Sequence, residues 1–177
     1  MSRPLVRYIR KTSRYKGPIE VIENAVPAGV FHPRNQEMGR REFGLPSKGI
    51  FIGTAGAISR SRDIDTLFKA FQILVQRRLD IHLVLAGPCD KGIFLPRNPQ
   101  VHYVGNLSPE KVPALLSTLD VAIICSRDSA FGRYCFPQKF YESLACGIPT
   151  VAAAVGSMRE LLHSYPAHLY EPQNAES

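Results

Sequence analysis

The sequence lacks the features that would carry the chain across a membrane, export it or bind a metal ion. No apolar run approaches a length of about 18 residues, which a bilayer span needs, and the N-terminus has no hydrophobic centre of a signal peptide. The four cysteines form no CxxC pair, and the five histidines form no HxxxH pattern. These absences predict reduced cysteines, no metal site and a cytoplasmic location, with the inner face of the membrane as an alternative.

Acidic residues are also missing from the first part of the chain. The formal net charge is +7, and six basic residues precede the first acidic one: Arg3, Arg7, Arg10, Lys11, Arg14 and Lys16. In the remainder, basic residues outnumber acidic ones by one. Residues 1–18 are therefore interpreted as a solvated basic tail, or as the end of a missing N-terminal domain. Peripheral contact with an anionic membrane surface is the alternative, and nucleic acid is not predicted as a partner.

The remaining residues, 19–177, show strand patterns that alternate with helix patterns, without an internal repeat. Short apolar runs predict strands, listed in order: 19–22, 49–56, 81–87, 101–105, 121–125, 150–154 and 168–170. Between the second and third of these runs, apolar residues at helical spacing from Ile64 to Val75 predict a helix packed on the core. This alternation predicts an α/β fold with a Rossmann-like, doubly wound parallel sheet joined by right-handed crossovers.

The stretch from Ser126 to Gly147 is the strongest candidate for a ligand site. It follows a buried strand and ends in a helix, which starts near Pro137 and is closed by Gly147. In an open parallel sheet, a loop of this kind lies at the carboxyl end of a strand, where ligands bind. Glu142 falls about a turn and a half into that helix, where a carboxylate can accept hydrogen bonds from paired sugar hydroxyls. The stretch therefore predicts a site for a ligand that carries both phosphate and sugar.

Two arginines mark a second place where an anion can bind. Arg60 and Arg62 precede the long helix, and their guanidinium groups have the planar geometry that matches phosphate oxygens. Cations at a helix start oppose the helix dipole, and a bound anion would offset that effect. Exposed arginines are more often simply solvated, so both interpretations remain open from these residues alone. No arrangement of serine, cysteine and histidine predicts a nucleophilic triad.

Five segments, in one order and at matching separations, resemble one protein family. They are Ile19–Val26, Phe31–Pro33, Gly53–Phe71, Val101–Leu107 and Pro137–Val151, the last of which resembles a Pro-x-Lys-x-x-Glu, Ala-Cys-Gly-x-Pro-Val-Val signature. The chain resembles the C-terminal half of GT-B glycosyltransferases of the retaining family 4 type, the glycosyl transferases group 1. The resemblance implies a GT-B half that binds a nucleotide-sugar, most simply a UDP- or GDP-sugar, with no metal.

The resemblance also assigns roles to residues. It implies that Glu142 holds the ribose hydroxyls and that Arg62 takes the place of a phosphate-binding lysine. The amides around Phe131 and Gly132 would then meet the donor sugar or its phosphate. Lys139 is the lysine of the signature and is included in the predicted donor site.

The chain departs from the family pattern at two functional positions. The family's phosphate-binding arginine falls on Ala57, and Arg60 is predicted to replace it. The family's first glutamate falls on Tyr134, and Asp128 is predicted to contact the sugar hydroxyls instead. The Phe-Gly pair also lies further upstream than usual, which predicts a longer loop.

The resemblance further implies what this chain does not contain. The family has an acceptor-binding domain before the crossing strand and further helices after the last strand, and both are expected to be absent here. The chain is therefore predicted to be the donor-binding part of a hexosyltransferase, inactive alone, with a surface-glycan or lipid-linked acceptor. A non-catalytic nucleotide-binding regulatory or docking subunit is one alternative, and a nucleotide-sugar epimerase of GT-B fold is another.

Overall fold

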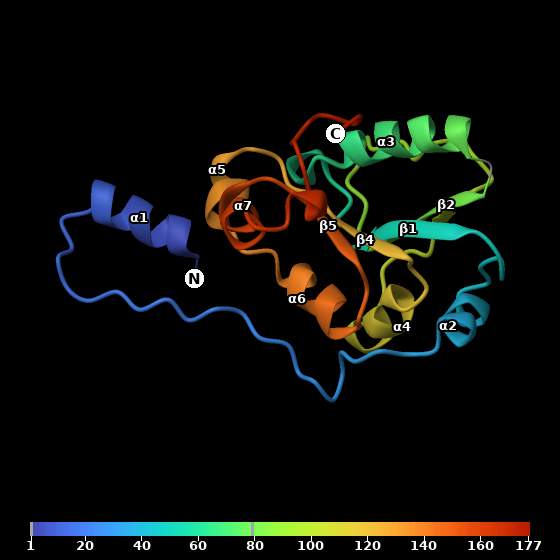
Figure 1. Ribbon diagram of the computed structural model, residues 1–177, viewed down its shortest axis with the longest axis horizontal. Coiled ribbons are helices and arrows are strands. Elements are labelled where there is room, and N and C mark those ends of the chain that lie inside the picture. The colour runs from blue at the N-terminus through green and yellow to red at the C-terminus, as the bar shows by residue number, and fades with distance from the viewer. Residues whose placement is uncertain (1, 79) are drawn as a thin grey trace.

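The fold is built on one parallel sheet, shown in Figure 1 from a computed structural model that describes residues 2–78 and 80–177. The six strands are β1 (Ile50–Ala55), β2 (Ile81–Ala86), β3 (Val101–Tyr103), β4 (Val121–Ile124), β5 (Thr150–Ala153) and β6 (Leu169–Tyr170). Their order across the sheet is β3-β2-β1-β4-β5-β6, and every neighbouring pair is parallel. This is the order of a doubly wound Rossmann-like sheet, with its switch point between β1 and β4, as predicted.

Helices cover both faces of this sheet. They are α1 (Arg3–Thr12), α2 (Gln36–Glu42), α3 (Ile64–Arg77), α4 (Val112–Leu116), α5 (Ala130–Tyr134), α6 (Gln138–Ala145) and α7 (Gly156–Leu161). Figure 1 shows α3 on one side of β1 and β2, with α2, α4 and α6 on the other. The predicted apolar stripe of α3 is confirmed, because Ile64, Leu67, Phe68 and Phe71 are buried against the strands. The two faces bury separate apolar clusters, which fixes the orientation of the strands between them.

Two local expectations for the N-terminal part were wrong. The segment 19–22 is not a strand but an extended piece of chain outside the sheet, and Ile22 is 75% exposed. An alternating pattern stabilises a strand only where a neighbouring strand completes the ladder. The basic segment, in which no periodicity was expected, contains the helix α1; Ser2 caps it by accepting a hydrogen bond from the backbone N–H of Leu5.

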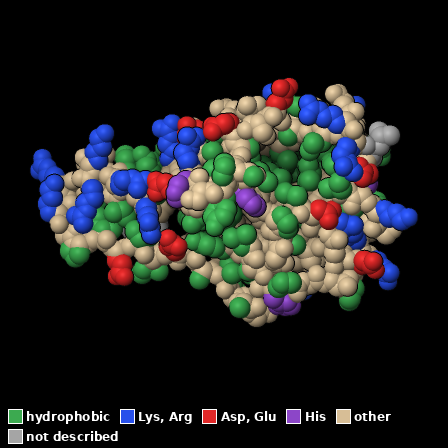
Figure 2. Space-filling model, in the orientation of Figure 1, with side chains coloured by type: hydrophobic (Ala, Val, Ile, Leu, Met, Phe, Trp, Pro, Cys, Tyr) green, Lys and Arg blue, Asp and Glu red, His purple; other side chains and the backbone are tan. Residues whose placement is uncertain are grey.

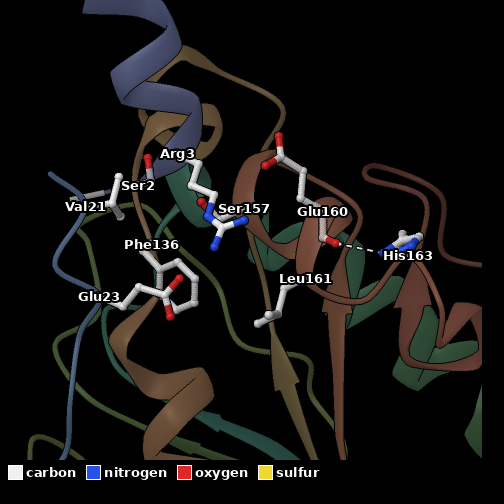
Figure 3. A pocket seen from close by; sticks show the side chains of 9 residues that line it. All are labelled: Ser2, Arg3, Val21, Glu23, Phe136, Ser157, Glu160, Leu161 and His163. Carbon is white, nitrogen blue, oxygen red and sulfur yellow. Dashed lines mark hydrogen bonds between the residues drawn. The ribbon is translucent and has the colours of Figure 1, made fainter. Parts of the chain in front are cut away.

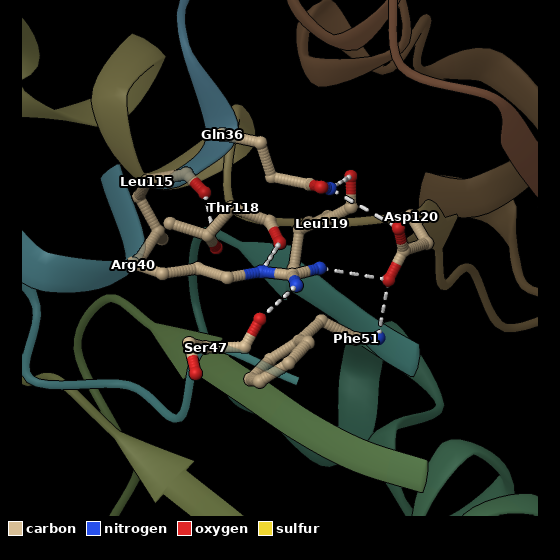
Figure 4. A network of polar contacts seen from close by, with 8 residues as sticks. All are labelled: Gln36, Arg40, Ser47, Phe51, Leu115, Thr118, Leu119 and Asp120. Atoms are coloured by element: carbon tan, nitrogen blue, oxygen red, sulfur yellow. Dashed lines mark hydrogen bonds and ion pairs between the residues drawn. The ribbon is translucent and has the colours of Figure 1, made fainter. Parts of the chain in front are cut away.

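A buried ion pair ties α2 to the amino ends of β1 and β4 (Figure 4). The guanidinium of Arg40, which is 7% exposed, donates to a carboxylate oxygen of Asp120 at 3.0 Å and to the backbone carbonyls of Thr118 and Ser47. The same Asp120 oxygen accepts a hydrogen bond from the backbone N–H of Phe51 at 2.7 Å, and the guanidinium lies 4.1 Å from the centre of the Phe51 ring. The charge is therefore removed from water but fully surrounded by acceptors.

Two histidines extend this cluster along the same face of the sheet. The sequence placed His82 and His102 inside strands, and the structure confirms this, with one imidazole nitrogen of each 3.0 Å from the other. The His82 ring stacks on Phe51 at 4.6 Å between centres. Burial lowers the pKa of both imidazoles, and the nearby Arg40 guanidinium lowers the pKa of His82 further.

We expect Asp120→Ala to lower the free energy of unfolding by about 3 kcal/mol, because it leaves the Arg40 charge buried without its partner. Urea denaturation measures the loss. Asp80→Ala is the matched control, since it breaks an equally short but exposed pair with Arg78 and should change stability by less than about 1 kcal/mol. Equal losses in the two variants would show that burial of the pair is unimportant.

The histidine pair should make stability depend on pH below neutrality. Because the folded state holds both pKa values below the unfolded value of about 6.5, the unfolded state binds more protons as the pH falls. Stability is then complete above about pH 6.5 and is lost progressively below it. We expect His102→Gln to flatten this dependence in denaturation experiments between about pH 7 and 5, whereas His32→Gln, at an exposed position, should leave the wild-type slope.

Candidate functional site

A cleft opens at the carboxyl ends of β1 and β2, next to the switch point of the sheet. Its volume is about 160 Å³, and it is lined by Ala55, Gly56, Ala86, Gly87, Pro88, Asn106, Leu107, Val112 and Glu142. The strand ends approach closely here, because a Cβ on Gly87 would collide with the carbonyl oxygen of Gly56, and both glycines have positive φ. Tyr103 supports this corner by donating its hydroxyl hydrogen to the carbonyl of Gly87. The cleft therefore presents backbone rather than side chains on its strand side.

Glu142 lies on the cleft wall, as the sequence predicts. It projects from α6, which begins one residue later than predicted, since Pro137 occupies the N-cap position and not the first turn. Burial raises the pKa of the Glu142 carboxyl, and the Lys139 ammonium opposes this shift. Within the described residues the Glu142 side chain forms no hydrogen bond or ion pair, so its carboxylate is available to accept hydrogen bonds from a ligand in the cleft.

Lys139, one turn before Glu142 on α6, reaches to the end of β1. A Cβ built on Gly56 would lie 2.5 Å from the Lys139 ammonium nitrogen, so the ammonium lies directly over the backbone of Gly56. Desolvation lowers the pKa of Lys139, and the Arg62 guanidinium lowers it further. Among residues 2–78 and 80–177, no carboxylate oxygen lies within 4.0 Å of the Lys139 ammonium nitrogen. The Lys139 ammonium is thus desolvated and is attracted by Cys125 and Glu142 without forming an ion pair among the described residues, which makes it a candidate for binding an anion.

Arg62 and Phe131 meet across the loop that precedes α3 and the loop that follows β4. The Arg62 guanidinium lies 4.6 Å from the centre of the Phe131 ring, which is half exposed. Gly132, next in α5, is buried, and a Cβ there would collide with the carbonyl oxygen of Arg127. The structure thus brings four predicted residues, Arg62, Phe131, Lys139 and Glu142, to one end of the sheet.

Arg60 and Asp128, which are predicted to replace two missing family residues, form ion pairs with other side chains. The guanidinium of Arg60 is 68% exposed and lies 3.9 Å from the carboxylate of Asp65 at the start of α3. The carboxylate of Asp128 accepts two hydrogen bonds from the guanidinium of Arg133, at 2.6 and 3.0 Å, which holds the pKa of Asp128 below its usual range. Neither residue lines the cleft, and of the other predicted site residues only Glu142 does, so the role of each of them in ligand binding stays a prediction.

The loop between β4 and α6 contains features that the sequence did not reveal. The short helix α5 forms within it, capped by Ser129, whose hydroxyl accepts a hydrogen bond from the N–H of Gly132. The Tyr134 side chain turns away from the cleft and packs on Tyr8 of α1, with 4.7 Å between ring centres. The capping residue Ser129 was the sequence signal from which α5 could have been predicted. No local sequence signal predicts the contact between α1 and α5, because it joins segments more than a hundred residues apart.

A second cavity, of about 180 Å³, lies between α1, the extended segment at residues 21–23 and α7 (Figure 3). Figure 3 shows the side chains of Arg3 and Glu23 entering it from opposite sides, beside the ring of Phe136. This cavity shares no lining residue with the cleft at Glu142. Its position under α1 makes it a packing gap of the N-terminal segment.

Neither a metal site nor a membrane span is found in the parts of the chain that the structure covers. No group of three or more histidine, cysteine, aspartate or glutamate side chains among those residues could hold a metal ion. No helix among them has both the length and the apolar character needed to cross a membrane. The four cysteines are free, Cys125 and Cys146 are buried, and burial raises the pKa of Cys125 to about 11.

Comparison with known sequences identifies relatives of this chain. Residues 35–177 match the family model described as glycosyl transferases group 1. The chain is 28% identical over 163 residues to a D-inositol 3-phosphate glycosyltransferase of Salinispora arenicola, which covers 79% of this chain and 35% of that protein. It is 26% identical over 161 residues to the putative teichuronic acid biosynthesis glycosyltransferase TuaH of Bacillus subtilis, covering 88% and 39%. The chain therefore spans little more than a third of the length of these relatives.

Comparison with solved structures shows the same fold. The C-terminal domain of a glycosyl transferase group 1 family protein, LpcC from Francisella tularensis, has a TM-score of 0.68 at 19% identity and covers 86% of this chain and 83% of that one. Sucrose-phosphate synthase from Thermosynechococcus elongatus has a TM-score of 0.77 at 22% identity, covering 99% and 45%. Anabaena HepE, solved with UDP and glucose, has a TM-score of 0.72 at 20% identity, covering 89% and 44%.

The desolvated ammonium of Lys139 should lower the free energy of unfolding of the ligand-free protein and should bind anions. We expect Lys139→Met to raise the free energy of unfolding by about 1 kcal/mol, because the unfolded state hydrates the ammonium better than the folded state does. Inorganic pyrophosphate should raise the melting temperature of the wild type and not of this variant. Lys69→Met, at an exposed position on α3, is the control and should change neither quantity. A variant that is less stable yet still responds to pyrophosphate would contradict this assignment.

Proposed function

The chain belongs to the glycosyl transferases group 1 family, and we propose that it supplies the donor site of an enzyme that moves a hexosyl group from a nucleotide-sugar to an acceptor hydroxyl with retention. It is a group 1 glycosyltransferase domain of the nucleotide-sugar donor half, with the Rossmann-like fold of one half of a GT-B enzyme. The observation that carries the proposal is the cleft at the strand ends, which Glu142 lines, with the ammonium of Lys139 from the same helix over the neighbouring Gly56.

Glu142 is proposed to hold the nucleoside. An ionised carboxylate only accepts hydrogen bonds, and the two adjacent hydroxyls of a ribose offer two donors at the matching spacing. The neighbouring lining of Gly87, Pro88 and Leu107 is apolar or backbone, which suits the flat face of a nucleobase. Because burial raises the pKa of Glu142, acidification should protonate the carboxyl and weaken this contact.

Lys139 and Arg62 are proposed to hold the diphosphate. When the bond between the anomeric carbon and the phosphate oxygen breaks, the electron pair stays on that oxygen, and negative charge grows on the leaving diphosphate. Cations that are already in place stabilise this charge without reorganising at the moment of reaction. The ammonium of Lys139 is desolvated over Gly56, and the guanidinium of Arg62 is oriented by the ring of Phe131, so both are pre-positioned. The acceptor oxygen bonds to the anomeric carbon, and its proton passes to the departing phosphate oxygen, so that bonds and charges balance.

The sugar end of the donor is proposed to lie toward α5. Phe131 and Gly132 stand at its first turn, within reach of a group bound beside Arg62. Asp128 is proposed to meet the sugar hydroxyls while its charge is balanced by Arg133, and Arg60 to approach the distal phosphate by leaving Asp65. The second step gives up an exposed ion pair, which contributes little to stability and so does not oppose the movement strongly.

The acceptor site is proposed to be completed outside this chain, by an acceptor-binding domain of the same polypeptide or of a partner. The curated relatives are nearly three times as long as the part that this chain matches, which supports this view. The proposed acceptor is a surface-glycan or lipid-linked glycan at the cytoplasmic face of the membrane, where the basic residues of the N-terminal segment would face anionic lipids. The chain by itself is proposed to bind donor without transferring sugar.

A non-catalytic binding subunit remains the second candidate, and one observation favours it. Tyr134, at the position of the family's first glutamate, packs on Tyr8 rather than facing the cleft, so it offers no replacement for the missing carboxylate. A radiolabelled nucleotide-sugar supplied to the full-length gene product separates the candidates. Transfer to an acceptor supports the enzyme, conversion of the donor sugar alone indicates an epimerase, and binding without turnover indicates the subunit.

Thermal unfolding against UDP, GDP, ADP and TDP tests the nucleoside site. We expect one nucleotide to raise the melting temperature of the wild type by several degrees, since saturation at a hundred times the Kd contributes about 2.7 kcal/mol. Glu142→Ala should abolish this shift, because the variant no longer accepts hydrogen bonds from the ribose. Glu37→Ala, which removes an exposed carboxylate on α2, should respond like the wild type.

The same experiment can contradict the proposal in two ways. If no nucleotide moves the midpoint at millimolar concentration, this chain does not contain a working donor site. If Glu142→Ala retains the full shift, the nucleotide binds elsewhere and the cleft has another role.

A further inference from the structure

A groove separate from the donor cleft runs between α1, α5 and the start of α7. Its volume is about 580 Å³, within the range of small-molecule sites. It is lined by Pro4, Arg7, Tyr8, Lys11, Thr12, Arg133, Tyr134, Gly156, Arg159 and Glu160. None of these residues lines the cleft that contains Glu142. Figure 2 shows Lys and Arg side chains gathered over the end of the molecule that α1 forms.

The groove collects positive charge from three separate segments of the chain. Arg7 and Lys11 lie one turn apart on α1, Arg133 lies on α5 and Arg159 on α7, while Glu160 is the single acidic side chain in the lining. The carboxylates that balance two of the arginines, Asp128 and Glu171, lie outside the lining. Arg133 and Arg159 are thus paired with carboxylates outside the groove, and four basic side chains against one acidic side chain leave its lining electropositive.

The ion pairs of these arginines leave the groove open to a stronger anion. The side chains of the pairs Arg7–Glu160, Arg133–Asp128 and Arg159–Glu171 are between 42% and 63% exposed. Exposed pairs of this kind contribute at most about 1 kcal/mol each, so a phosphate group can exchange with the carboxylates. Lys11 has no carboxylate within 4.0 Å in the part of the chain that the structure describes. It is therefore the cation most available to an incoming phosphate.

The floor of the groove is aromatic. Tyr8 and Tyr134 are in contact, with 4.7 Å between ring centres and 39° between ring planes, and Tyr8 is 45% exposed. The hydroxyl of Ser2 also donates to the carbonyl of Tyr134 at 2.6 Å, which fixes α1 against α5. A tyrosine presents an apolar face with a polar tip, and this combination suits a sugar ring, which has C–H faces and a rim of hydroxyls.

We propose that this groove binds a sugar phosphate, with the phosphate at Lys11 and Arg7 and the sugar ring on Tyr8. The groove borders the C-terminal end of α5, and the first turn of this short helix is proposed to face the donor sugar, so a sugar phosphate here would lie one short helix away from that sugar. This last step, which makes the groove part of the acceptor site, rests on the proposed function. The binding itself does not.

Isothermal titration of the folded chain with glucose 1-phosphate tests the proposal, with glucose and inorganic phosphate as separate probes. We expect Lys11→Gln to weaken the binding of glucose 1-phosphate about tenfold, which corresponds to 1.4 kcal/mol. Lys16→Gln removes a cation from the same basic segment but outside the groove, and it should change the affinity by less than about twofold. Tyr8→Ala should weaken glucose 1-phosphate more than inorganic phosphate, because only the former has a ring to place on the tyrosine.

Three outcomes would overturn the proposal. Equal losses in Lys11→Gln and Lys16→Gln would show diffuse attraction to the basic segment. Loss of binding in Lys139→Met with full binding in Lys11→Gln would place the sugar phosphate in the donor cleft. No binding to the wild type would exclude the groove as a site. The nucleotide response of Lys11→Gln, measured in parallel, should equal that of the wild type, so failure here is distinguishable from failure of the donor site.

A further arm of the experiment separates the two sources of this ligand. Phosphatidylcholine vesicles with and without a lipid-linked glucosyl phosphate are sedimented with the wild type and Lys11→Gln. Retention on the glucosyl phosphate vesicles that is lost in Lys11→Gln assigns a lipid-linked ligand. Binding of soluble glucose 1-phosphate without retention on vesicles assigns a free sugar phosphate.

Discussion

The close approach of the backbone at the carboxyl end of β1 is the constraint on which the donor site depends. A Cβ on Gly87, at the end of β2, would meet the carbonyl oxygen of Gly56, and a Cβ on Gly56 would meet the ammonium of Lys139. The cleft opens at the carboxyl ends of β1 and β2, next to the switch point between β1 and β4, where ligands bind in open parallel sheets. The position of the Lys139 ammonium at the site thus requires that the residue at the end of β1 has no side chain.

Buried cations at the two ends of the sheet have opposite surroundings. At the amino end, the Arg40 guanidinium is buried with an ion-pair partner and two backbone carbonyls, and it joins α2 to the strands. At the carboxyl end, the ammonium of Lys139 is desolvated without such a partner. The first arrangement stabilises the fold, while the second lowers stability and keeps a cation available. A fold that has a binding site is expected to pair its buried charges elsewhere and to leave a charge at the site available for the ligand.

The helix α1 connects the N-terminal segment to the loop that follows β4. Its contacts with α5 and α7 close one cavity, create the groove and hold Tyr134 away from the cleft. Since α5 also carries Phe131, which orients Arg62, the position of α1 is coupled through one short helix to the predicted phosphate site. The donor cleft and the groove share no lining residue, and α5 is the element that links their surroundings.

The sequence by itself determined the six strands of the sheet in chain order, the core face of α3 and the cleft position of Glu142, because all of these follow from local periodicity and from the rule that loops follow parallel strands at one edge. It also contained the cap that begins α1, Ser2 with a proline shortly after, although basic residues obscured the pattern. Only the tertiary structure decided that 19–22 is not a strand, since a ladder needs a neighbour. The ion pairs were likewise decided by the fold: Asp128 pairs with Arg133 and Arg60 with Asp65, while Lys139 forms no ion pair with any residue that the structure describes. Charge pairing depends on distances between segments remote in the chain, and a linear pattern does not encode those distances.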